Sequence, residues 1–482
     1  MPPFPGRPNK KASSHLRLVS CALVGLFTVW GVGAAETAWK VEVPASLRDE
    51  IASAWTQASN ILQRIQAPTF PDFSVSVTNY GAKPGGQTDC SDAIRRAIEA
   101  CHKAGGGHVI VPAGEFLTGA IHLLSGVDLH LAEGATLKFT TDPDAYLPVV
   151  FTRFEGMECY NYSPLIYAYE QENIAITGNG TLDGQANAEN WWAWKSREIG
   201  GMGARPGAGV RLVQMVASNT PVELRRFGKG SRLRPTFIEP NRCRNVLIEG
   251  INIRRSPMWE IHPLLCTNVI VRGVNIVSHG PNNDGCDPES CRDVLVEDCL
   301  FDTGDDCIAI KSGRNNDGRR VGVPSANLII RNCTMKDGHG GVTIGSEISG
   351  GCSNVFVESC AMDSANLDRV LRFKSNAMRG GIIQNVFMRN VTVGRVADSV
   401  LQIDFVYEEG ANGPYRPVAR NIVMQNVTVR NTPRVLNVVG FPGAEISGVR
   451  ILDSVFGQVG KPDVVKGTTD VMLMNCAVEP NN

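Results

Sequence analysis

The sequence lacks the features that would point to a nucleic-acid-binding, membrane-spanning or fibrous protein. The formal net charge is −1 over 482 residues, so no global field draws the chain to nucleic acid or to an anionic membrane. After the first 35 residues, no stretch is long and apolar enough to cross a bilayer. No C-x-x-C pair with metal-site spacing occurs. The 50 glycines follow no collagen period and suit many tight turns.

The first 35 residues have the pattern of an export signal. Lys10, Lys11 and Arg17 precede an apolar run over 18–32, and small residues follow at 33–35, where cleavage would occur. A membrane anchor is an alternative, but the run is short for a span. A lipoprotein signal ending at Cys21 is disfavoured because most of the apolar run follows that cysteine. We therefore expect a secreted or periplasmic protein with no stable membrane association after signal removal.

Two helices are predicted before the main pattern begins. Residues 36–74 form a helical or linker segment, with a helix that starts near Ser46 and ends at Pro68. A second, amphipathic helix is predicted over 92–103, where Ser91 can act as its N-cap. Short strands punctuated by glycine follow it. This order predicts a helical cap on a stack of strands.

A repeat occupies most of residues 75–475. Units of a strand, a small polar turn and a second strand recur, and from Asn245 onward their starts are 23 to 36 residues apart. They begin at Asn173, Asn245, Asn268, Asp293, Asn327, Asn354, Asn385, Asn421 and Gly448. Such units bury their apolar sides only by stacking, which predicts an all-β fold, a right-handed parallel β-helix with an N-terminal capping helix. A β-propeller, the alternative, needs longer units. The repeated asparagines can form a side-chain ladder.

The alignment of the repeats also places the cysteines. After cleavage near Ala35, 13 of the 14 remain, and many share equivalent positions in successive coils. We interpret them as small core hydrophobes in columns, with disulfides between coils as the alternative. A loop insertion at about 188–235 interrupts the repeat and opens with Trp191, Trp192 and Trp194. These rings either stack on sugars or plug the loop against the strands.

Alternation within the strands gathers one set of polar residues on one surface. With Ile308 and Ile310 inward, Asp305 and Lys311 face outward, and Asp306 joins them only if the chain bends at Gly304. The same argument turns His339 outward on the next coil, and Arg372 and Lys374 on the one after. Consecutive coils lie about 4.8 Å apart, so we expect one patch. Acids gathered with a histidine and two cations suggest cleavage of an acidic polymer.

The chain resembles the polygalacturonases of glycoside hydrolase family 28, bacterial type. The motifs that carry the resemblance are Asn283-Asp284-Gly285, Gly304-Asp305-Asp306, Gly338-His339-Gly340 and Arg372-Phe373-Lys374. The resemblance covers about residues 75–460 and implies inverting hydrolysis of α-1,4-linked galacturonan in pectin of the plant cell wall.

The resemblance also implies roles for individual residues. Asp305 would be the general acid, Asp284 and Asp306 would hold and activate water, and His339 would support the acid. Arg372 and Lys374 would bind the galacturonate carboxylate. Asn282, Tyr407 and Lys311 are further candidates for substrate binding. Inversion requires about 6.5–9.5 Å between acid and base.

Other activities remain open at this point. A rhamnogalacturonan or xylogalacturonan hydrolase would use the same fold. A calcium-dependent pectate lyase would use a similar β-helix. A non-catalytic glycan-binding β-helix would need neither an acid nor a base. We expect no metal and no cofactor, an acidic polysaccharide as partner, no nucleic acid, and a monomer. The sequence leaves exo and endo action undecided, although the 188–235 insertion could block one end of a cleft.

Overall fold

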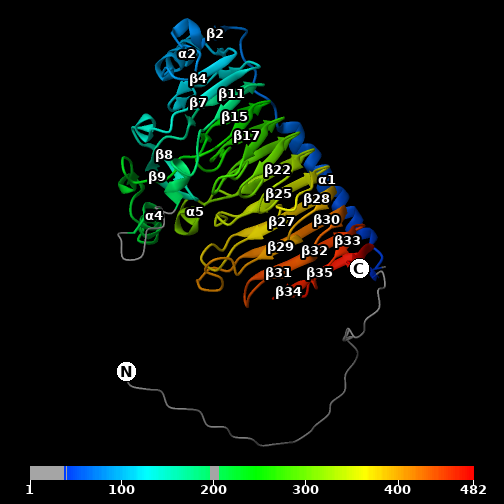
Figure 1. Ribbon diagram of the computed structural model, residues 1–482. Helices are drawn as coiled ribbons and strands as arrows, with labels where there is room; N and C mark the ends of the chain where they lie inside the picture. Colours follow the sequence, from blue (N-terminus) through cyan, green and yellow to red (C-terminus); the bar gives the residue numbers. More distant parts are fainter. Residues whose placement is uncertain (1–36, 40, 196–205, 482) are drawn as a thin grey trace, which may run out of the picture. The chain divides into compact units, whose positions relative to one another are not determined.

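Parallel strands stacked coil upon coil make up the protein (Figure 1). This computed structural model describes residues 37–39, 41–195 and 206–481, so the predicted signal at 1–35 lies outside the described residues. Residues Glu36–Asn482 form one compact unit. Successive coils pair in register, as where Val246 lies beside Val269 and Val269 beside Val294. The predicted parallel β-helix is confirmed. Within the described ranges, no helix has the length and apolarity to span a membrane.

The strands form three rows that run the length of the stack. The first row contains β2 (Ser74–Ser76), β3 (Gly107–Val111), β6 (Val127–Leu131), β11 (Glu172–Gly178), β15 (Arg244–Glu249), β17 (Thr267–Arg272), β19 (Arg292–Glu297), β22 (Ser325–Arg331), β25 (Cys352–Glu358), β28 (Ile382–Arg395), β30 (Val418–Asn431), β32 (Glu445–Leu452) and β35 (Val471–Met474). The second row contains β4 (Gly114–Thr118), β7 (Ala135–Phe139), β12 (Thr181–Asp183), β16 (Asn252–Arg254), β18 (Asn275–Ser278), β20 (Leu300–Thr303), β23 (Thr334–Met335), β26 (Ala361–Met362), the later parts of β28 and β30, β33 (Val455–Val459) and β36 (Cys476–Pro480). The third row contains β5 (Ile121–His122), β10 (Ile166–Tyr169), β14 (Ile238–Asn241), β21 (Ile308–Ile310), β24 (Val342–Ile344), β27 (Arg369–Lys374), β29 (Ser399–Asp404), β31 (Arg434–Val439) and β34 (Val464–Lys466).

The asparagine that opens each repeat has two structural tasks. At Asn245 and Asn354 the backbone φ is +58°, a left-handed conformation that asparagine tolerates better than most residues. The side chains also form the predicted ladder. Asn268 Nδ2 donates to Asn245 Oδ1 at 2.8 Å, and Asn354 Nδ2 donates to Asn327 Oδ1 at 3.0 Å. The φ of +62° at Gly448 explains why glycine can replace asparagine in that repeat.

The interior of the coils is apolar and includes the cysteine columns. The backbone N–H of Cys243 donates to Cys266 Sγ at 3.3 Å, and that of Cys266 donates to Cys291 Sγ at 3.4 Å. All thirteen cysteines in the described ranges are buried and free. Cys21 lies outside those ranges. The interpretation as small core residues is therefore confirmed, and the disulfides considered as an alternative do not occur among the described cysteines.

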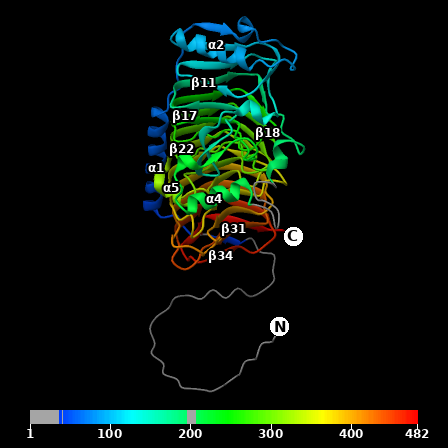
Figure 2. The same cartoon turned by 90° about the vertical axis from the view of Figure 1, so that its left-hand side faces the viewer.

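Helix α1 (Ala45–Arg64) lies along the outer side of the first row (Figure 2). It buries Trp55 and Ile61 against outward-facing apolar residues of the strands, which are Ala175, Leu247, Ile270, Leu295, Ile329, Phe356, Phe387, Val423, Leu452 and Met474. The prediction of a helix here is right, and its start near Ser46 is within one residue, but its end at Pro68 is wrong. Pro44 immediately precedes the first turn, and Ile65 is already extended three residues before Pro68.

Helix α2 (Ser91–Lys103) lies at the end of the stack where the first coils begin (Figure 1). Its buried face, which includes Ala93, Ile98 and Cys101, joins the main core, as its predicted amphipathic pattern requires. The bounds differ from the predicted 92–103 by one residue. Ser91 is the first helical residue rather than the N-cap, because Cys90 occupies that position.

A side layer covers the outward face of the third row near the middle of the stack. It consists of β8 (Val150–Phe154) and β9 (Met157–Asn161), which form an antiparallel hairpin, with β13 (Arg226–Phe227), α4 (Ala208–Ala217) and α5 (Asn315–Val321) beside them. Arg153 Nη1 donates to Glu289 Oε1 at 2.8 Å, and Tyr167 donates its hydroxyl to the Phe151 carbonyl. These contacts fix the hairpin to the coils. The insertion predicted at 188–235 supplies α4 and β13, and its residues 196–205 lie outside the described residues.

Candidate active site

A cavity of about 320 Å³ opens on the outward side of the third row. Its lining is almost entirely charged or polar and consists of Glu155, Lys195, Trp259, Asn282, Asp284, Asp305, Lys311, Arg314, His339, Ser346, Glu347, Arg372, Lys374, Tyr407 and Glu408. Every site residue predicted from the sequence is in this lining except Asp306. The patch expected from strand alternation therefore exists, and it is concave.

The coils bring the reacting groups together from separate parts of the chain. Asp305 lies in the turn between β20 and β21, and His339 lies in the turn between β23 and β24. Arg372 alternates with the buried Leu371 and Phe373 in β27, as predicted. Each of these turns and strands stacks on its equivalent in the next coil, so their side chains share one surface.

Asp305 and His339 are directly bonded. His339 Nδ1 lies 2.9 Å from Asp305 Oδ1, which also accepts the backbone N–H of Asp306 at 3.0 Å. The hydrogen bond to Asp305 raises the pKa of His339, although burial acts in the opposite direction. The side chain of Asp305 is 18% exposed and faces the cavity. One oxygen is thus held in place while the carboxyl group remains reachable.

Asp306 is fully buried behind the cationic pair. Its Oδ2 lies 2.7 Å from Lys374 Nζ, and its Oδ1 accepts bonds from Thr343 Oγ1 at 2.8 Å and Arg372 Nη1 at 3.3 Å. All three partners face outward, so the chain does bend at Gly304 as the prediction required. Burial alone would raise the pKa of Asp306, but Lys374 and Arg372 outweigh it and hold the pKa well below its usual value. Asp306 is therefore an ionised anchor.

Asp284 forms part of the cavity floor, and its pKa shifts in the opposite direction to that of Asp306. Burial raises its pKa well above the usual value, and the charge of Asp305 raises it further. One oxygen from each of Asp284, Asp305 and Asp306 lies within 4.8 Å of the others. The three carboxyls approach so closely because they come from adjacent coils. The separation of about 6.5–9.5 Å expected for inversion is that of the whole acid and base carboxyl groups rather than of their nearest oxygens.

Ion pairs that the sequence did not reveal join several residues of the cavity lining. Glu155, in the turn of the β8–β9 hairpin, accepts a bond from Arg314 Nη1 at 2.9 Å and lies 3.5 Å from Lys195 Nζ. Arg314 Nη2 in turn lies 3.7 Å from Glu408 Oε2. The hairpin and the insertion thus contribute to one charged group of the lining, which we call the end wall and which consists of Glu155, Lys195, Arg314 and Glu408. No repeat or motif marks the hairpin, so its position could not be predicted.

Residues 198–439, about half of the chain, match the family described as Glycosyl hydrolases family 28. A solved exopolygalacturonase from Thermotoga maritima is 44% identical with a TM-score of 0.80, and the match covers 86% of this chain and 96% of that one. The chain belongs to glycosyl hydrolase family 28. It is therefore a glycosidase. Residues 74–140 match a second description, "Rhamnogalacturonase A/epimerase, pectate lyase-like".

Two further relatives place this family 28 chain among plant and bacterial proteins. A "Probable polygalacturonase" of Vitis vinifera is 28% identical, over 84% of this chain and 79% of the relative. An "Endo-polygalacturonase" of Pectobacterium parmentieri is 27% identical, over 75% of this chain and 82% of the relative. The family that the four motifs suggested is therefore the one to which the chain belongs.

The other predicted substrate-binding residues of this family 28 site differ in accessibility. Asn282 accepts a bond from Arg234 Nη2 at 2.8 Å, and Tyr407 presents its ring 5.6 Å from Lys374 Nζ. Lys311 is only 3% exposed, and its ammonium faces carboxylates of the protein. Lys311 therefore belongs to the cavity lining, as the sequence argument expected, but its ammonium is already paired with carboxylates of the protein.

The three tryptophans of the insertion act as a plug rather than as a sugar platform. Trp191 is buried in the main core and packs edge-on against Tyr146. Trp192 Nε1 donates to the Ser256 carbonyl at 2.8 Å. None of these three tryptophans is among the described residues that line the cavity. The second of the two interpretations from the sequence is therefore correct.

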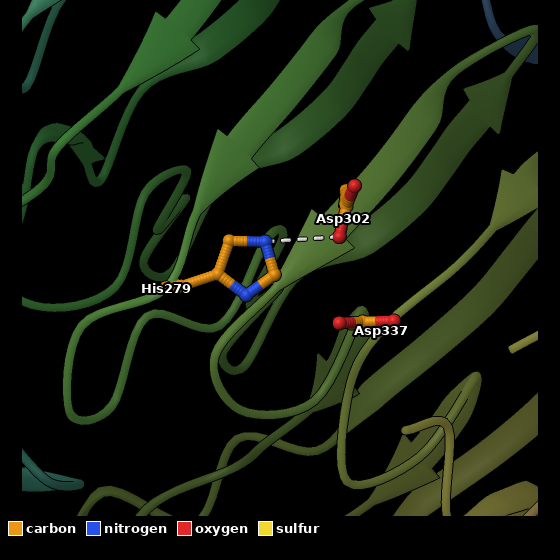
Figure 3. Close-up of side chains that lie close together, drawn as sticks. All are labelled: His279, Asp302 and Asp337. Atoms are coloured by element: carbon orange, nitrogen blue, oxygen red, sulfur yellow. Dashed lines mark ion pairs between the residues drawn. The ribbon is translucent and has the colours of Figure 1, made fainter. Parts of the chain in front are cut away.

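A histidine and two aspartates lie close together at or just after the ends of β18, β20 and β23 (Figure 3). His279 Nε2 pairs with Asp302 at 2.9 Å, and Asp337 points toward the same place. Asp337 accepts bonds from Ser364 Oγ and from Asn366 Nδ2. These contacts tie together the loops that lead to Asp284, Asp305 and His339, and we assign this cluster a structural task.

Proposed function

We propose that the protein is a polygalacturonase, which hydrolyses α-1,4-galacturonosidic bonds in polygalacturonate and so degrades pectin. The observation that carries the proposal is a single cavity that joins Asp284 and Asp305 with Arg372 and Lys374. Carboxyl groups supply acid and base for glycosidic cleavage. Cations at the same place suit a sugar that itself carries a carboxylate. The names of the family 28 relatives agree with this substrate.

Asp305 acts as the general acid. It is the most exposed of the three aspartates and gives its proton to the glycosidic oxygen as the bond from that oxygen to the anomeric carbon breaks. The leaving sugar keeps the proton. His339 orients Asp305 through the bond to Oδ1. Its own raised pKa lets it stay protonated in mildly acidic solution and return a proton to the site.

Water, rather than a carboxylate, attacks the anomeric carbon. The water oxygen bonds to that carbon, and Asp284 takes the released proton. A retaining mechanism would instead need a carboxylate oxygen in contact with the carbon. The side chains of Asp284 and Asp306 are only 4% and 0% exposed, which opposes such contact. The reaction therefore inverts the anomeric centre, and the buried charge of Asp306 keeps the cations and the water in place.

Arg372 and Lys374 recognise the sugar carboxylate. Both are charged and both already share Asp306, so a substrate carboxylate becomes their second anionic partner. Gln402 Oε1 accepts a hydrogen bond from Arg372 Nε at 3.2 Å. Gln402 and Asp306 together therefore fix the orientation of the Arg372 guanidinium. Tyr407 completes this side of the cavity. A neutral sugar at this position would leave the cations without that partner.

The end wall supports exo action. A groove that is closed at one end holds the terminus of a polymer, whereas an open groove accepts an internal stretch. Ion pairs join Glu155, Arg314 and Glu408 within the lining, and we infer that they close one end of the cavity. The relative at 44% identity is an exopolygalacturonase, although one of the relatives at 27% is an endo-enzyme. We further propose export, because the polymer lies outside cells and residues 1–35 have the pattern of a signal.

Time-resolved NMR of polygalacturonate with the purified enzyme tests these points together. We expect saturated mono- or digalacturonate from the earliest times, with the anomeric configuration inverted and little loss of viscosity. A ladder of long products would contradict exo action, and retained configuration would contradict water attack. Unsaturated products that disappear with EDTA would indicate a calcium-dependent lyase. No cleavage by wild type would overturn the substrate assignment.

The variant Asp305→Asn separates catalysis from binding. The amide keeps the shape of the carboxyl but cannot donate a proton to the glycosidic oxygen, so we expect a loss of at least about 100-fold in kcat. Binding of oligogalacturonate, measured by calorimetry, should stay within a few-fold of wild type. Near-normal turnover would show that Asp305 is not the acid. The exposed Asp363→Asn on the second row, where Asp363 lies outside the cavity, serves as the matched control.

A further inference from the structure

Beneath the cavity, a set of buried carboxyls surrounds the side chain of Lys311. Its Nζ lies 3.3 Å from Glu347 Oε2, 3.6 Å from Asp284 Oδ2 and 3.8 Å from Asp287 Oδ2. The ring centroid of Trp259 lies 4.4 Å from the same nitrogen. The ammonium is thus enclosed by groups of the protein itself. A substrate carboxylate would have to displace one of them.

The backbone fixes the root of this side chain. Lys311 follows β21, and its N–H donates to the Pro288 carbonyl at 2.9 Å. Its own carbonyl accepts the N–H of Ser290 at 2.9 Å and the hydroxyl of Ser325 at 2.7 Å. Neighbouring coils on both sides therefore set where the ammonium lies. A charge held so firmly can orient a catalytic group without itself moving.

The two carboxyl oxygens of Asp284 have different surroundings. Oδ2 faces Lys311, whereas Oδ1 is buried and has no hydrogen-bond partner among the described residues. A buried acceptor without a partner marks a place where a water or a proton belongs. Asp284 lines the cavity floor, so this oxygen lies where an attacking water would be held. One oxygen is anchored and the other is available.

We propose that Lys311 is a positioning residue of the reaction, whose ammonium holds Oδ2 of Asp284 so that Oδ1 receives the attacking water. This inference rests on the proposed function, in which Asp284 is the base. It assigns Lys311 a part in kcat rather than in substrate binding. Glu347 and Asp287 belong to the same arrangement, because they hold the ammonium from its other sides.

The charges around Asp284 favour this interpretation. Burial and the carboxylate of Asp305 raise its pKa, and that of Asp306 adds to them, while Lys311 and Lys374 act in the opposite direction. The remaining facing groups are the carboxyls of Glu260 and Asp287. A base must be ionised to take a proton. Loss of the Lys311 charge would therefore move the acidic limb of the pH–rate profile to higher pH.

The variant Lys311→Met tests the proposal, because it keeps the length of the side chain and removes the charge. With trigalacturonate as substrate, we expect kcat to fall roughly 100-fold while KM changes less than about threefold. The acidic limb of kcat/KM against pH should shift upward. A rise in KM with an unchanged limb would overturn the proposal in favour of substrate binding. Lys336→Met, an exposed position outside the cavity, should leave both parameters unchanged.

A second variant separates positioning from folding, since Lys311→Met leaves buried carboxylates without their cation. The double variant Lys311→Met/Asp287→Asn removes one of those carboxylates, and Asp287 is not in the cavity lining. We expect thermal stability close to wild type with kcat still low and the limb still shifted. Recovery of wild-type turnover would overturn the proposal. Wild type is measured in parallel, so an inactive wild type would instead overturn the proposed function.

Discussion

At the residue scale, three aspartates of one cavity differ because their neighbours differ. Asp306 has two cationic partners and a hydroxyl, and its pKa is lowered despite complete burial. Asp284 has one ammonium at 3.6 Å and two carboxyls nearby, and its pKa is raised. Asp305 meets a histidine and solvent. The type of residue therefore supplies the carboxyl, whereas the neighbouring coils lower the pKa of Asp306 and raise that of Asp284.

Glu260 provides a test of this argument through pH. Burial raises its pKa well above 4.5, the charge of Asp284 raises it further, and neither carboxyl oxygen has a hydrogen-bond partner among the described residues. A folded pKa above the unfolded one means that the native state binds more protons, so stability falls as the pH rises above about 4.5. We expect Glu260→Gln to match wild type near pH 4 and to exceed it at pH 8.

The difference should grow by up to about 1.4 kcal/mol for each pH unit in that window. Urea denaturation of wild type and Glu260→Gln at a series of pH values measures it. Glu133→Gln, at an exposed position, is the matched control and should show no such growth. A difference between Glu260→Gln and wild type that stays constant from pH 4 to pH 8 would contradict a proton held on Glu260.

At the element scale, α1 serves as the cover of the first row of strands. In each coil the residues on either side of the outward position point inward, as Val246 and Ile248 do on either side of Leu247. Three consecutive apolar residues are typical of a strand that is buried on both faces. Helix α1 covers the second face. The ring centroids of Trp55 and Phe356 lie 5.5 Å apart, and Arg389 Cζ lies 3.7 Å from the centroid of the Trp55 ring.

Removal of the Trp55 ring should weaken the fold without touching the chemistry. We expect Trp55→Ala to lower the free energy of unfolding by about 3–5 kcal/mol, because a large side chain leaves a cavity behind. No described residue of α1 lines the active-site cavity, so kcat/KM of the folded variant should equal that of wild type. Chemical denaturation and initial rates at low temperature measure the two quantities.

An exposed position two residues further along the same helix supplies the control. Gln57 is exposed, so Gln57→Ala should change the stability by less than about 0.5 kcal/mol. If Trp55→Ala were as stable as wild type, α1 would be a loosely attached segment. If its turnover were lost while the protein remained folded, the helix would have a part in catalysis that the structure does not suggest.

At the scale of the whole molecule, repetition decides what the sequence could reveal. The asparagine columns, the cysteine columns and the four catalytic motifs recur or alternate, so coil stacking could be used to place them. The end wall has no such signature. Glu155 belongs to a hairpin outside the repeat. It pairs with Arg314, some 160 positions later in the sequence, only because the fold brings the two loops that carry them together. The burial of Lys311 and Asp306 likewise depends on partners from other coils.

The free thiols allow the integrity of the whole stack to be measured. The thirteen described cysteines are all buried and are distributed from the first coils to the last, at Cys476. Burial raises the pKa of Cys101 to about 11 and raises those of Cys159 and Cys307 as well. Hydrogen bonds with neighbouring thiols instead lower the pKa of Cys243 and of Cys333, but both thiols are buried like the others. Alkylation needs an accessible thiolate. In a chain that begins at Glu36, we expect iodoacetamide to label none of them in the native state.

In guanidinium without reductant, all thirteen should be labelled, as counted by intact-protein mass spectrometry. Labelling that requires prior reduction would reveal disulfides between coils and contradict the free columns. Because each coil contacts only its neighbours, a solenoid opens most readily at its ends. Partial labelling at low denaturant should therefore begin at Cys476, and only later reach Cys299 and Cys333 in the middle of the stack. Simultaneous labelling of all positions would instead show that the coils and α1 unfold as one cooperative unit.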